Sequence, residues 1–125
     1  MSVKVVDASA FGALLFGEPQ AQAIAARLAD ATLTAPALLP FEVANIALKK
    51  IRRHPHLCAP LLTAFSLFGR MAVEIIAVDH EEIVRLADET GLTAYDSSYL
   101  WLARTLGAEL ITLDHRLGAT AGGTS

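Results

Sequence analysis

Two of the acidic residues that could carry chemistry directly follow predicted β-strands. Asp7 follows the run VKVV, residues 3–6, and Asp114 follows the run ELITL, residues 109–113. Both runs are short and mostly apolar, which is typical of buried parallel strands. Because the carboxyl ends of parallel strands form the edge where α/β proteins bind ligands, we expect both carboxylates at one rim of a sheet.

Two further acids fall in the first turns of predicted helices. Glu42 lies in the segment LLPFEVANIALKKIRR, where Pro40 suits an early helical position. Asp96 lies in the segment TAYDSSYL, where Thr93 and Asp96 have the spacing of a capping box. If both helices begin above the same rim, three or four carboxylates converge there.

Each of these acids, taken singly, also has a purely structural explanation. Asp7 and Asp114 can cap the helices that follow them, and Glu42 and Asp96 are favoured by the helix dipole or by capping. Capping does not explain why all four would share one rim. Two carboxylates about 4 Å apart repel each other by roughly 4 kcal/mol at an effective dielectric constant near 20, so a cation must offset their charge.

The donor types predict which cation this would be. The chain has a single cysteine, Cys58, and no histidine at metal-ligand spacing, so the proposed ligands are all oxygens. Such sites select a hard divalent ion, Mg²⁺ or Mn²⁺, and are a poor fit for zinc. Ser9, Asn45 and Thr112 lie close to the acids in sequence and could orient the carboxylates or ordered water, although local bonds to the backbone would also explain them.

Composition limits the kind of protein that carries these residues. The 125 residues fit one domain, which we place at 1–118, with a flexible tail at 119–125. Hydrophobic residues make up 54% of the chain, and no segment reaches the roughly 18 apolar residues of a membrane span. We therefore expect a soluble cytoplasmic protein. The net charge of −3 argues against nucleic-acid binding through bulk positive charge.

The elements that must position the acids alternate between strand and helix. We expect strands at 3–6, 32–35, 73–78 and 109–113, with helices between them, which predicts an α/β layer structure. In the helix that carries Glu42, the core-facing stripe is predicted to be Phe41, Ala44, Leu48 and Ile51. The next helix, LCAPLLTAFSLFGRM, is apolar on most sides and is predicted to be buried in the core or in a subunit contact.

Four segments, in order along the chain, resemble the PIN-domain ribonucleases, specifically the VapC-type toxins of bacterial toxin–antitoxin pairs. The segments are VVDASA, LLPFEVANIAL, GLTAYDSSYLWLA and LITLDHRL, and together they run over essentially the whole chain. The resemblance implies a three-layer α/β/α sandwich around a parallel sheet. It also implies that Asp7, Glu42, Asp96 and Asp114 match the acidic quartet of the family, accompanied by Ser9, Asn45 and Thr112.

The resemblance further implies metal-dependent hydrolysis of RNA phosphodiester bonds. Mg²⁺ or Mn²⁺ would be held by Asp7, Asp96 and Asp114, with Glu42 as a ligand or as an orienter of the attacking water. A homodimer and a cognate antitoxin protein are implied as well. The alternative is a PIN-fold module that binds RNA or protein without catalysis, and the intact quartet weighs against it.

Basic residues are clustered even though the chain is acidic overall. Arg116 follows Asp114 by two residues and is the best-placed candidate to contact an RNA phosphate. Lys49, Arg52 and Arg53 lie one to two or more turns beyond Glu42 on its predicted helix. These three residues could contact RNA, an acidic antitoxin segment, or only solvent.

Overall fold

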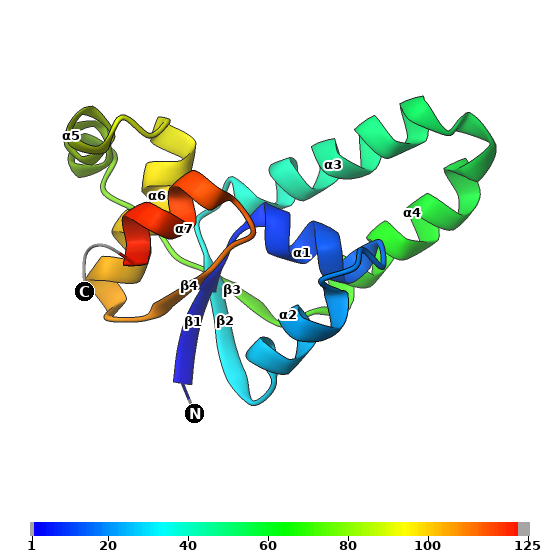
Figure 1. The fold of residues 1–125 in the computed structure, drawn as a ribbon, viewed down its shortest axis with the longest axis horizontal. Helices are drawn as coiled ribbons and strands as arrows, with labels where there is room; N and C mark the ends of the chain where they lie inside the picture. The colour runs from blue at the N-terminus through cyan, green and yellow to red at the C-terminus, as the bar shows by residue number, and fades with distance from the viewer. Residues whose placement is uncertain (1, 123–125) are drawn as a thin grey trace.

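A four-stranded parallel sheet forms the centre of the computed structural model, which describes residues 2–122 (Figure 1). The strand order is β3-β2-β1-β4. The strands are β1 (Ser2–Val6), β2 (Ala31–Ala35), β3 (Val73–Ile75) and β4 (Glu109–Ile111). Val6 of β1 is in register with Ile111 of β4, so the two strands end together. The acids that follow these strands are therefore brought to the same edge of the sheet.

Helices lie on both sides of this sheet. Figure 1 shows α1 to α4 on one side and α5 to α7 on the other. The helices are α1 (Ala8–Leu15), α2 (Ala21–Leu28), α3 (Leu39–Arg53), α4 (Cys58–Ser66), α5 (His80–Thr90), α6 (Ala94–Leu106) and α7 (His115–Gly122). The predicted three-layer α/β/α sandwich is confirmed.

The core fills the space between the sheet and the helices. Val5 and Val6 of β1 are fully buried, and so are large side chains from both helical layers, including Phe11 and Leu102. Phe11 meets Phe68 edge to face, with ring centroids 5.4 Å apart. This core fixes where α1 and α6 begin, and both helices begin at the edge of the sheet that carries the acids.

The predicted core stripe of α3 is wrong. Phe41 is 80% exposed and Leu48 is 40% exposed, whereas the buried residues of α3 are Leu39, Val43 and Ala47. The α3 helix is apolar on two faces, and the face that packs is the one beside α1. Ile46 lies so near Gly12 of α1 that its Cδ1 would be 3.1 Å from a Cβ atom at that glycine. Close approach of the two helices selected this face.

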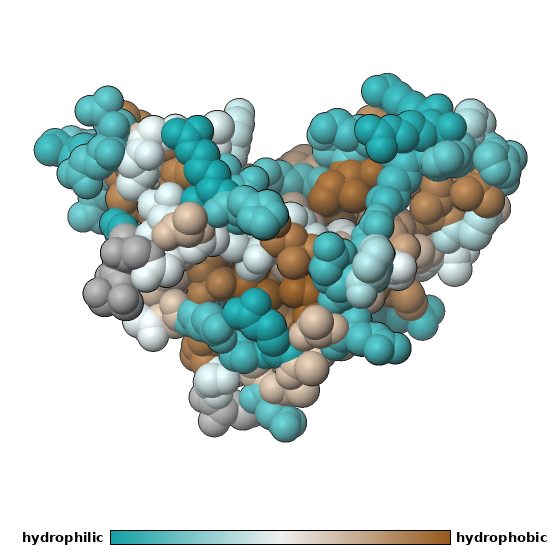
Figure 2. Space-filling view, viewed as in Figure 1, coloured by the Kyte–Doolittle hydropathy of each residue, from teal (hydrophilic) through white to brown (hydrophobic). Residues whose placement is uncertain are grey.

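The α4 helix also differs from its prediction. None of its residues is fully buried, although its sequence is apolar on most sides. Leu62 is 51% exposed, and α3 and α4 together form an arm that projects from the sheet (Figure 1). Figure 2 shows brown, apolar surface on this arm between patches of polar residues. Burial of α4 in the core is therefore excluded, and its predicted role in a subunit contact stays a prediction.

The predicted tail differs as well. The helix α7 continues to Gly122, and Ala121 packs against the core, so residues 119–122 belong to the folded domain. Residues 123–125 lie outside the described part of the chain. The predicted strand 73–78 is shorter than expected, with only Val73–Ile75 pairing to β2. None of the helices within residues 2–122 has the length and hydrophobicity needed to cross a membrane.

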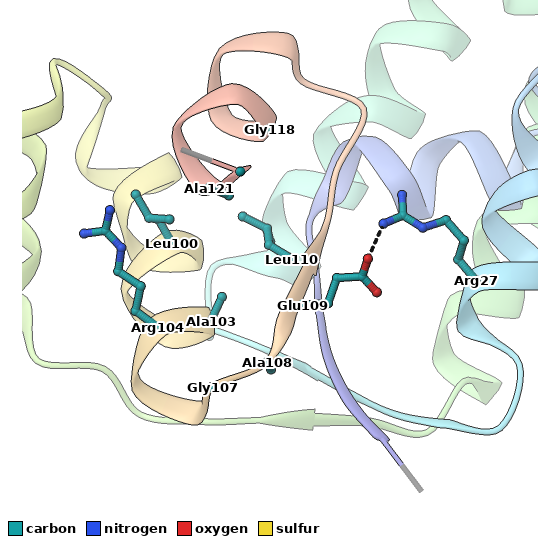
Figure 3. A pocket seen from close by; sticks show the side chains of 11 residues that line it. Arg27, Leu100, Ala103, Arg104, Gly107, Ala108, Glu109, Leu110, Gly118 and Ala121 are labelled. Carbon is teal, nitrogen blue, oxygen red and sulfur yellow. Dashed lines mark hydrogen bonds and ion pairs between the residues drawn. The ribbon is translucent and has the colours of Figure 1, made fainter. Parts of the chain in front are cut away.

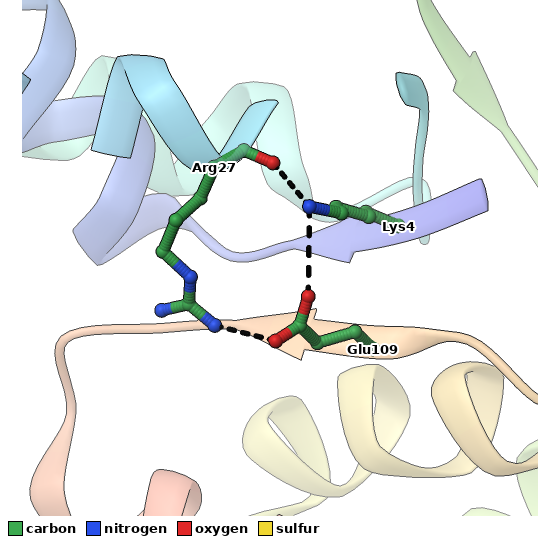
Figure 4. Close-up of polar contacts among 3 residues, drawn as sticks. All are labelled: Lys4, Arg27 and Glu109. Carbon is green, nitrogen blue, oxygen red and sulfur yellow. Dashed lines mark hydrogen bonds and ion pairs between the residues drawn. The ribbon is translucent and has the colours of Figure 1, made fainter. Parts of the chain in front are cut away.

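A charged cluster at the amino-terminal side of the sheet ties α2 to two strands (Figure 4). Arg27 Nη2 lies 2.8 Å from Glu109 Oε2, and Lys4 Nζ lies 3.6 Å from Glu109 Oε1. Lys4 Nζ also donates a hydrogen bond to the carbonyl of Arg27. Arg27 and Glu109 are about half exposed, so this cluster contributes on the order of 1 kcal/mol or less for each pair.

Candidate active site

Asp7 is held rigidly at the junction of β1 and α1. Its carboxylate is the N-cap of α1, accepting a hydrogen bond from the Ala10 amide at 3.1 Å, as the capping explanation predicted. The residue is only 5% exposed, and Ser9 Oγ donates a second bond to Oδ1 at 2.7 Å. A capping role and a place in a site are therefore combined in one side chain.

Thr112 links Asp7 to the opposite end of the chain. Its hydroxyl donates to Asp7 Oδ2 and accepts a bond from the Asp114 amide at 3.0 Å. Ser9 Oγ in turn accepts a bond from the Leu113 amide at 2.9 Å. The two hydroxyls predicted to support the acids thus connect the end of β1 with the segment after β4, and they fix the orientation of the Asp7 carboxylate.

Glu42 is positioned by a tyrosine on a different helix. Tyr99 of α6 donates a hydrogen bond from its hydroxyl to Glu42 Oε1 at 2.6 Å. The ring of Tyr99 is 1% exposed, so this bond lies at the boundary between the core and the site. Tyr99 is not among the site residues predicted from the sequence. The signal that identifies it is its position one helical turn after Asp96, which places both side chains on one face of α6.

Asp96 and Asp114 lie at the starts of the last two helices. Thr93 caps α6 by accepting a bond from the Asp96 amide at 3.1 Å, which realises one half of the predicted capping box. Asp114 Oδ1 accepts a bond from the Leu117 amide at 2.7 Å, so Asp114 caps α7. In the same way Asp79 caps α5 by accepting a hydrogen bond from the Glu82 amide.

One small pocket collects all four acids. It has a volume of about 140 Å³, and its lining residues are Asp7, Ala8, Ser9, Glu42, Asp96, Tyr99 and Asp114. The acids come from four separate segments, as the strand ends and helix starts predicted. In the view of Figure 2 the molecule is notched between the arm formed by α3 and α4 and the part that carries α5.

The electrostatics of Asp7 reflect its burial beside other acids. Burial raises the pKa of the Asp7 carboxyl above its ordinary value, while the bonds from Thr112, Ser9 and the Ala10 amide oppose this rise. The negative charge of Asp114 raises the pKa of Asp7 further. The three hydrogen-bond donors therefore do not fully offset the effects of burial and of the neighbouring negative charge on the Asp7 carboxylate.

Glu42 and Asp96 are perturbed in the same direction. Burial raises the pKa of both carboxyls, and each is raised further by neighbouring acids of the pocket. The hydrogen bond from Tyr99 opposes the rise at Glu42, and the charge of Arg116 opposes it at Asp96. Burial and the bond to Glu42 raise the pKa of Tyr99 far above its usual range, so Tyr99 keeps its proton and remains a donor.

The donors suit a divalent cation, but their spacing leaves room for water. Within residues 2–122, no group of three or more His, Cys, Asp and Glu side chains stands at a spacing that could hold a metal ion directly. Mg²⁺ usually keeps several waters and takes only one or two carboxylates from a protein. Besides burial, repulsion between the carboxylates of the pocket raises the pKa values of Asp7, Glu42 and Asp96. A bound divalent ion would offset this repulsion.

Other predicted site residues lie outside this pocket. Asn45 does not line it and instead lines a neighbouring groove with Phe41 and Glu42. Lys49, Arg52 and Arg53 are exposed on the second half of α3, about 10 to 17 Å beyond Glu42 along the helix axis. Arg116 differs from them, because its guanidinium is close enough to act on the charge of Asp96.

A second hollow, of about 490 Å³, lies away from the acids (Figure 3). Its walls are the carboxyl-terminal halves of α6 and α7 together with β4, and no member of the quartet lines it. Arg27 and Glu109 at its mouth are paired with each other, as the dashed line in Figure 3 marks. This hollow is larger than the acid pocket, and its Arg27 and Glu109 side chains already satisfy each other.

Comparisons with known proteins give the family. The family model described as PIN domain matches residues 4–123. Ribonuclease VapC3 from Pyrobaculum aerophilum is 32% identical over 118 residues, which are 90% of this chain and 90% of that protein. The crystal structure of PAE2754 from the same organism has a TM-score of 0.67 at 28% identity, and the match covers 94% of this chain and 78% of that one.

A more distant structure has the same fold. VapC20 from Mycobacterium tuberculosis, a toxin that cleaves the sarcin-ricin loop, has a TM-score of 0.66 at 15% identity over 94% of both chains. At this identity the likeness shows the fold alone. The family model and the VapC3 match each span nearly the whole sequence, so the chain belongs to the PIN-domain family and is a homologue of the VapC proteins.

Proposed function

We propose that the protein is a divalent-metal-dependent endoribonuclease that acts as the toxin of a toxin–antitoxin pair. The observation that carries the proposal is the pocket in which Asp7, Glu42, Asp96 and Asp114 converge from four segments, three of them with raised pKa values. A protein that only needed helix caps would have no reason to gather these charges. The names of its relatives support RNA as the substrate.

In this proposal the four acids have two different roles, metal binding and orientation of the attacking water. Asp7, Asp96 and Asp114 would hold Mg²⁺ or Mn²⁺ in part through the waters that the ion keeps, and Ser9 and Thr112 orient the Asp7 carboxylate. When bound, such an ion makes water more acidic and offsets the negative charge that develops on a phosphodiester during hydrolysis. Glu42, which is held by the hydrogen bond from Tyr99, would orient the attacking water and accept a proton from it.

Partners belong to the proposal too. An antitoxin protein and a second copy of the chain are proposed as partners, and exposed apolar side chains support them. Two exposed side chains lie on the arm formed by α3 and α4: Phe41, 80% exposed, and Leu62, 51% exposed. Leu67, 46% exposed, lies in the turn directly after α4. Apolar surface of this kind typically marks a site of protein contact.

The test is RNA cleavage by the purified protein. We expect cleavage with Mg²⁺ or Mn²⁺, none in EDTA, and loss of cleavage in Asp96→Asn with the melting temperature retained. Metal should also raise the melting temperature of the parent more than that of Asp7→Asn, because binding to the folded state stabilises it. Cleavage by Asp96→Asn at the parental rate would contradict the mechanism.

The same experiment separates the alternative function. A non-catalytic PIN module would bind RNA or protein but would not cleave RNA with any metal. Equal metal-induced shifts in the melting temperatures of the parent and Asp7→Asn would favour that module, since they would show that Asp7 contributes to no metal site.

A further inference from the structure

Arg116 lies against the end of α5 in an unusual way. Its Nη2 atom would be only 2.7 Å from a Cβ atom built on Gly91, a distance that real Cβ atoms essentially never show. Gly91 ends α5 and has a left-handed backbone, with φ of 75°. The guanidinium therefore occupies space that exists only because residue 91 has no side chain.

This placement suits a cation. The carboxyl-terminal end of a helix carries partial negative charge on its last carbonyls, which favours a positive group beside it. Arg116 comes from the first turn of α7, so the contact joins the end of α5 to the helix that Asp114 caps. Gly91 lies two residues before Thr93, the N-cap of the helix that carries Asp96, so the contact holds the guanidinium near the start of α6.

The charge of Arg116 is left to act on an incoming anion. Within residues 2–122 its guanidinium forms no ion pair with a carboxylate, although it is close enough to Asp96 to oppose the burial-driven rise in the pKa of that carboxyl. The guanidinium offers several N–H donors that can bind one RNA phosphate. A neighbouring phosphodiester of the same RNA would then lie at the acid pocket, where it is hydrolysed.

We propose that Gly91 is a positioning residue for RNA cleavage: its missing side chain lets Arg116 lie against the end of α5, where Arg116 binds an RNA phosphate at the rim of the acid pocket. The inference rests on the proposed function and adds to it the residue that places the phosphate-binding group. A side chain at residue 91 would displace the guanidinium without touching any of the four acids.

The chain offers a matched control at Gly107. This glycine also ends a helix, α6, in a left-handed conformation with φ of 61°, but a Cβ atom built there meets nothing within 4 Å. Alanine at either position adds similar backbone strain and should lower the melting temperature by a similar few degrees. Only alanine at residue 91 also meets Arg116.

The experiment measures how kcat/KM for a single-stranded RNA depends on KCl concentration. Each phosphate contact contributes about −0.7 to the slope of log affinity against log salt for a single strand. We expect Arg116→Ala to lower kcat/KM about 10-fold or more and to flatten the slope by about 0.7. Gly91→Ala should change both quantities in the same direction, whereas Gly107→Ala should leave both at the parental values.

Three results would overturn the inference. They are a parental slope in Gly91→Ala, an equal change in Gly107→Ala, or a further loss when Gly91→Ala is added to Arg116→Ala. If alanine prevents folding, Gly91→Asn and Gly107→Asn replace the pair, because asparagine tolerates the left-handed region.

Failure of the proposed ribonuclease function can be distinguished from failure of the role proposed for Gly91. If the parent itself does not cleave RNA with metal, the slope is measured on RNA binding by fluorescence anisotropy. A parent that neither cleaves nor binds RNA overturns both proposals. A parent that cleaves RNA with a slope unaffected by residue 91 overturns only the role of Gly91.

Discussion

Replacing Tyr99 by phenylalanine should impair the enzyme through Glu42 while leaving the core packed. The substitution removes one oxygen atom, the hydroxyl that donates to Glu42 Oε1 at 2.6 Å, and keeps a ring that is 1% exposed. A hydrogen bond to a charged group contributes about 1.5–3 kcal/mol. Glu42 is only half buried, so we expect the lower end of this range, about 1.5 kcal/mol.

The sign of the pH effect follows from the same contact. Burial raises the pKa of Glu42, and the bond from Tyr99 opposes that rise. Without the hydroxyl the pKa of Glu42 should rise further, so the acidic limb of the pH–rate profile should move to higher pH. A loss of about 1.5 kcal/mol corresponds to roughly a 10-fold lower kcat/KM at neutral pH.

The assay is kcat/KM for RNA cleavage from pH 5 to 9 at saturating Mg²⁺ or Mn²⁺. Tyr95→Phe is the control, since it makes the same chemical change on the same helix at a side chain that is 65% exposed. If Tyr99→Phe kept the parental rate and the parental acidic limb, the role assigned to the hydrogen bond would be refuted.

Three further predictions concern the acid pocket and the exposed basic residues of α3. The metal-free protein should lose stability as pH rises above about 4, the ordinary pKa range of carboxyls. Burial raises the pKa values of Asp7, Glu42 and Asp96, so the folded state binds more protons than the unfolded state. Thermal melts in EDTA would measure this, and a rise in stability with pH above that ordinary range would contradict it. Thr112→Val should lower the melting temperature by about 4–8 °C, because Asp7 loses a hydrogen-bond donor and the Asp114 amide loses an acceptor. An unchanged melting temperature would show that the hydrogen bonds of the Thr112 hydroxyl do not stabilise the fold. Joint replacement of Lys49, Arg52 and Arg53 by alanine should flatten the salt dependence of RNA binding by up to about 2 with kcat retained, and an unchanged slope would assign them to a protein partner or to solvent.

The positions of the acids could be predicted because they depend on local sequence. Strand runs followed by Asp7 and Asp114, and the capping pattern before Asp96, identify element ends, and the ends of parallel strands share an edge. Each cap seen in the structure at Asp7, Thr93 and Asp114 satisfies backbone groups within three residues of itself. Such short-range rules do not depend on how the rest of the chain packs.

The features that the sequence did not predict depend on contacts between distant segments. The helix α3 is apolar on two faces, and the face that packs against α1, where Ile46 meets Gly12, is the one that buries Val43 and leaves Phe41 exposed. The bond from Tyr99 to Glu42 joins residues 57 positions apart, and Arg116 meets Gly91 from another helix. Periodicity within a single helix cannot identify these pairs.

The pairing of β1 with β4 also sets the order in which a ribosome could complete this protein. The ribosome makes Asp7 well before its Thr112 donor, which lies 105 positions later, and the Asp7 amide itself donates to the carbonyl of Ile111. During synthesis at about 5–20 residues per second, β1 has a free edge and Asp7 lacks that donor until β4 has left the ribosome. A nascent chain without residues 109–117 therefore cannot assemble the acid pocket.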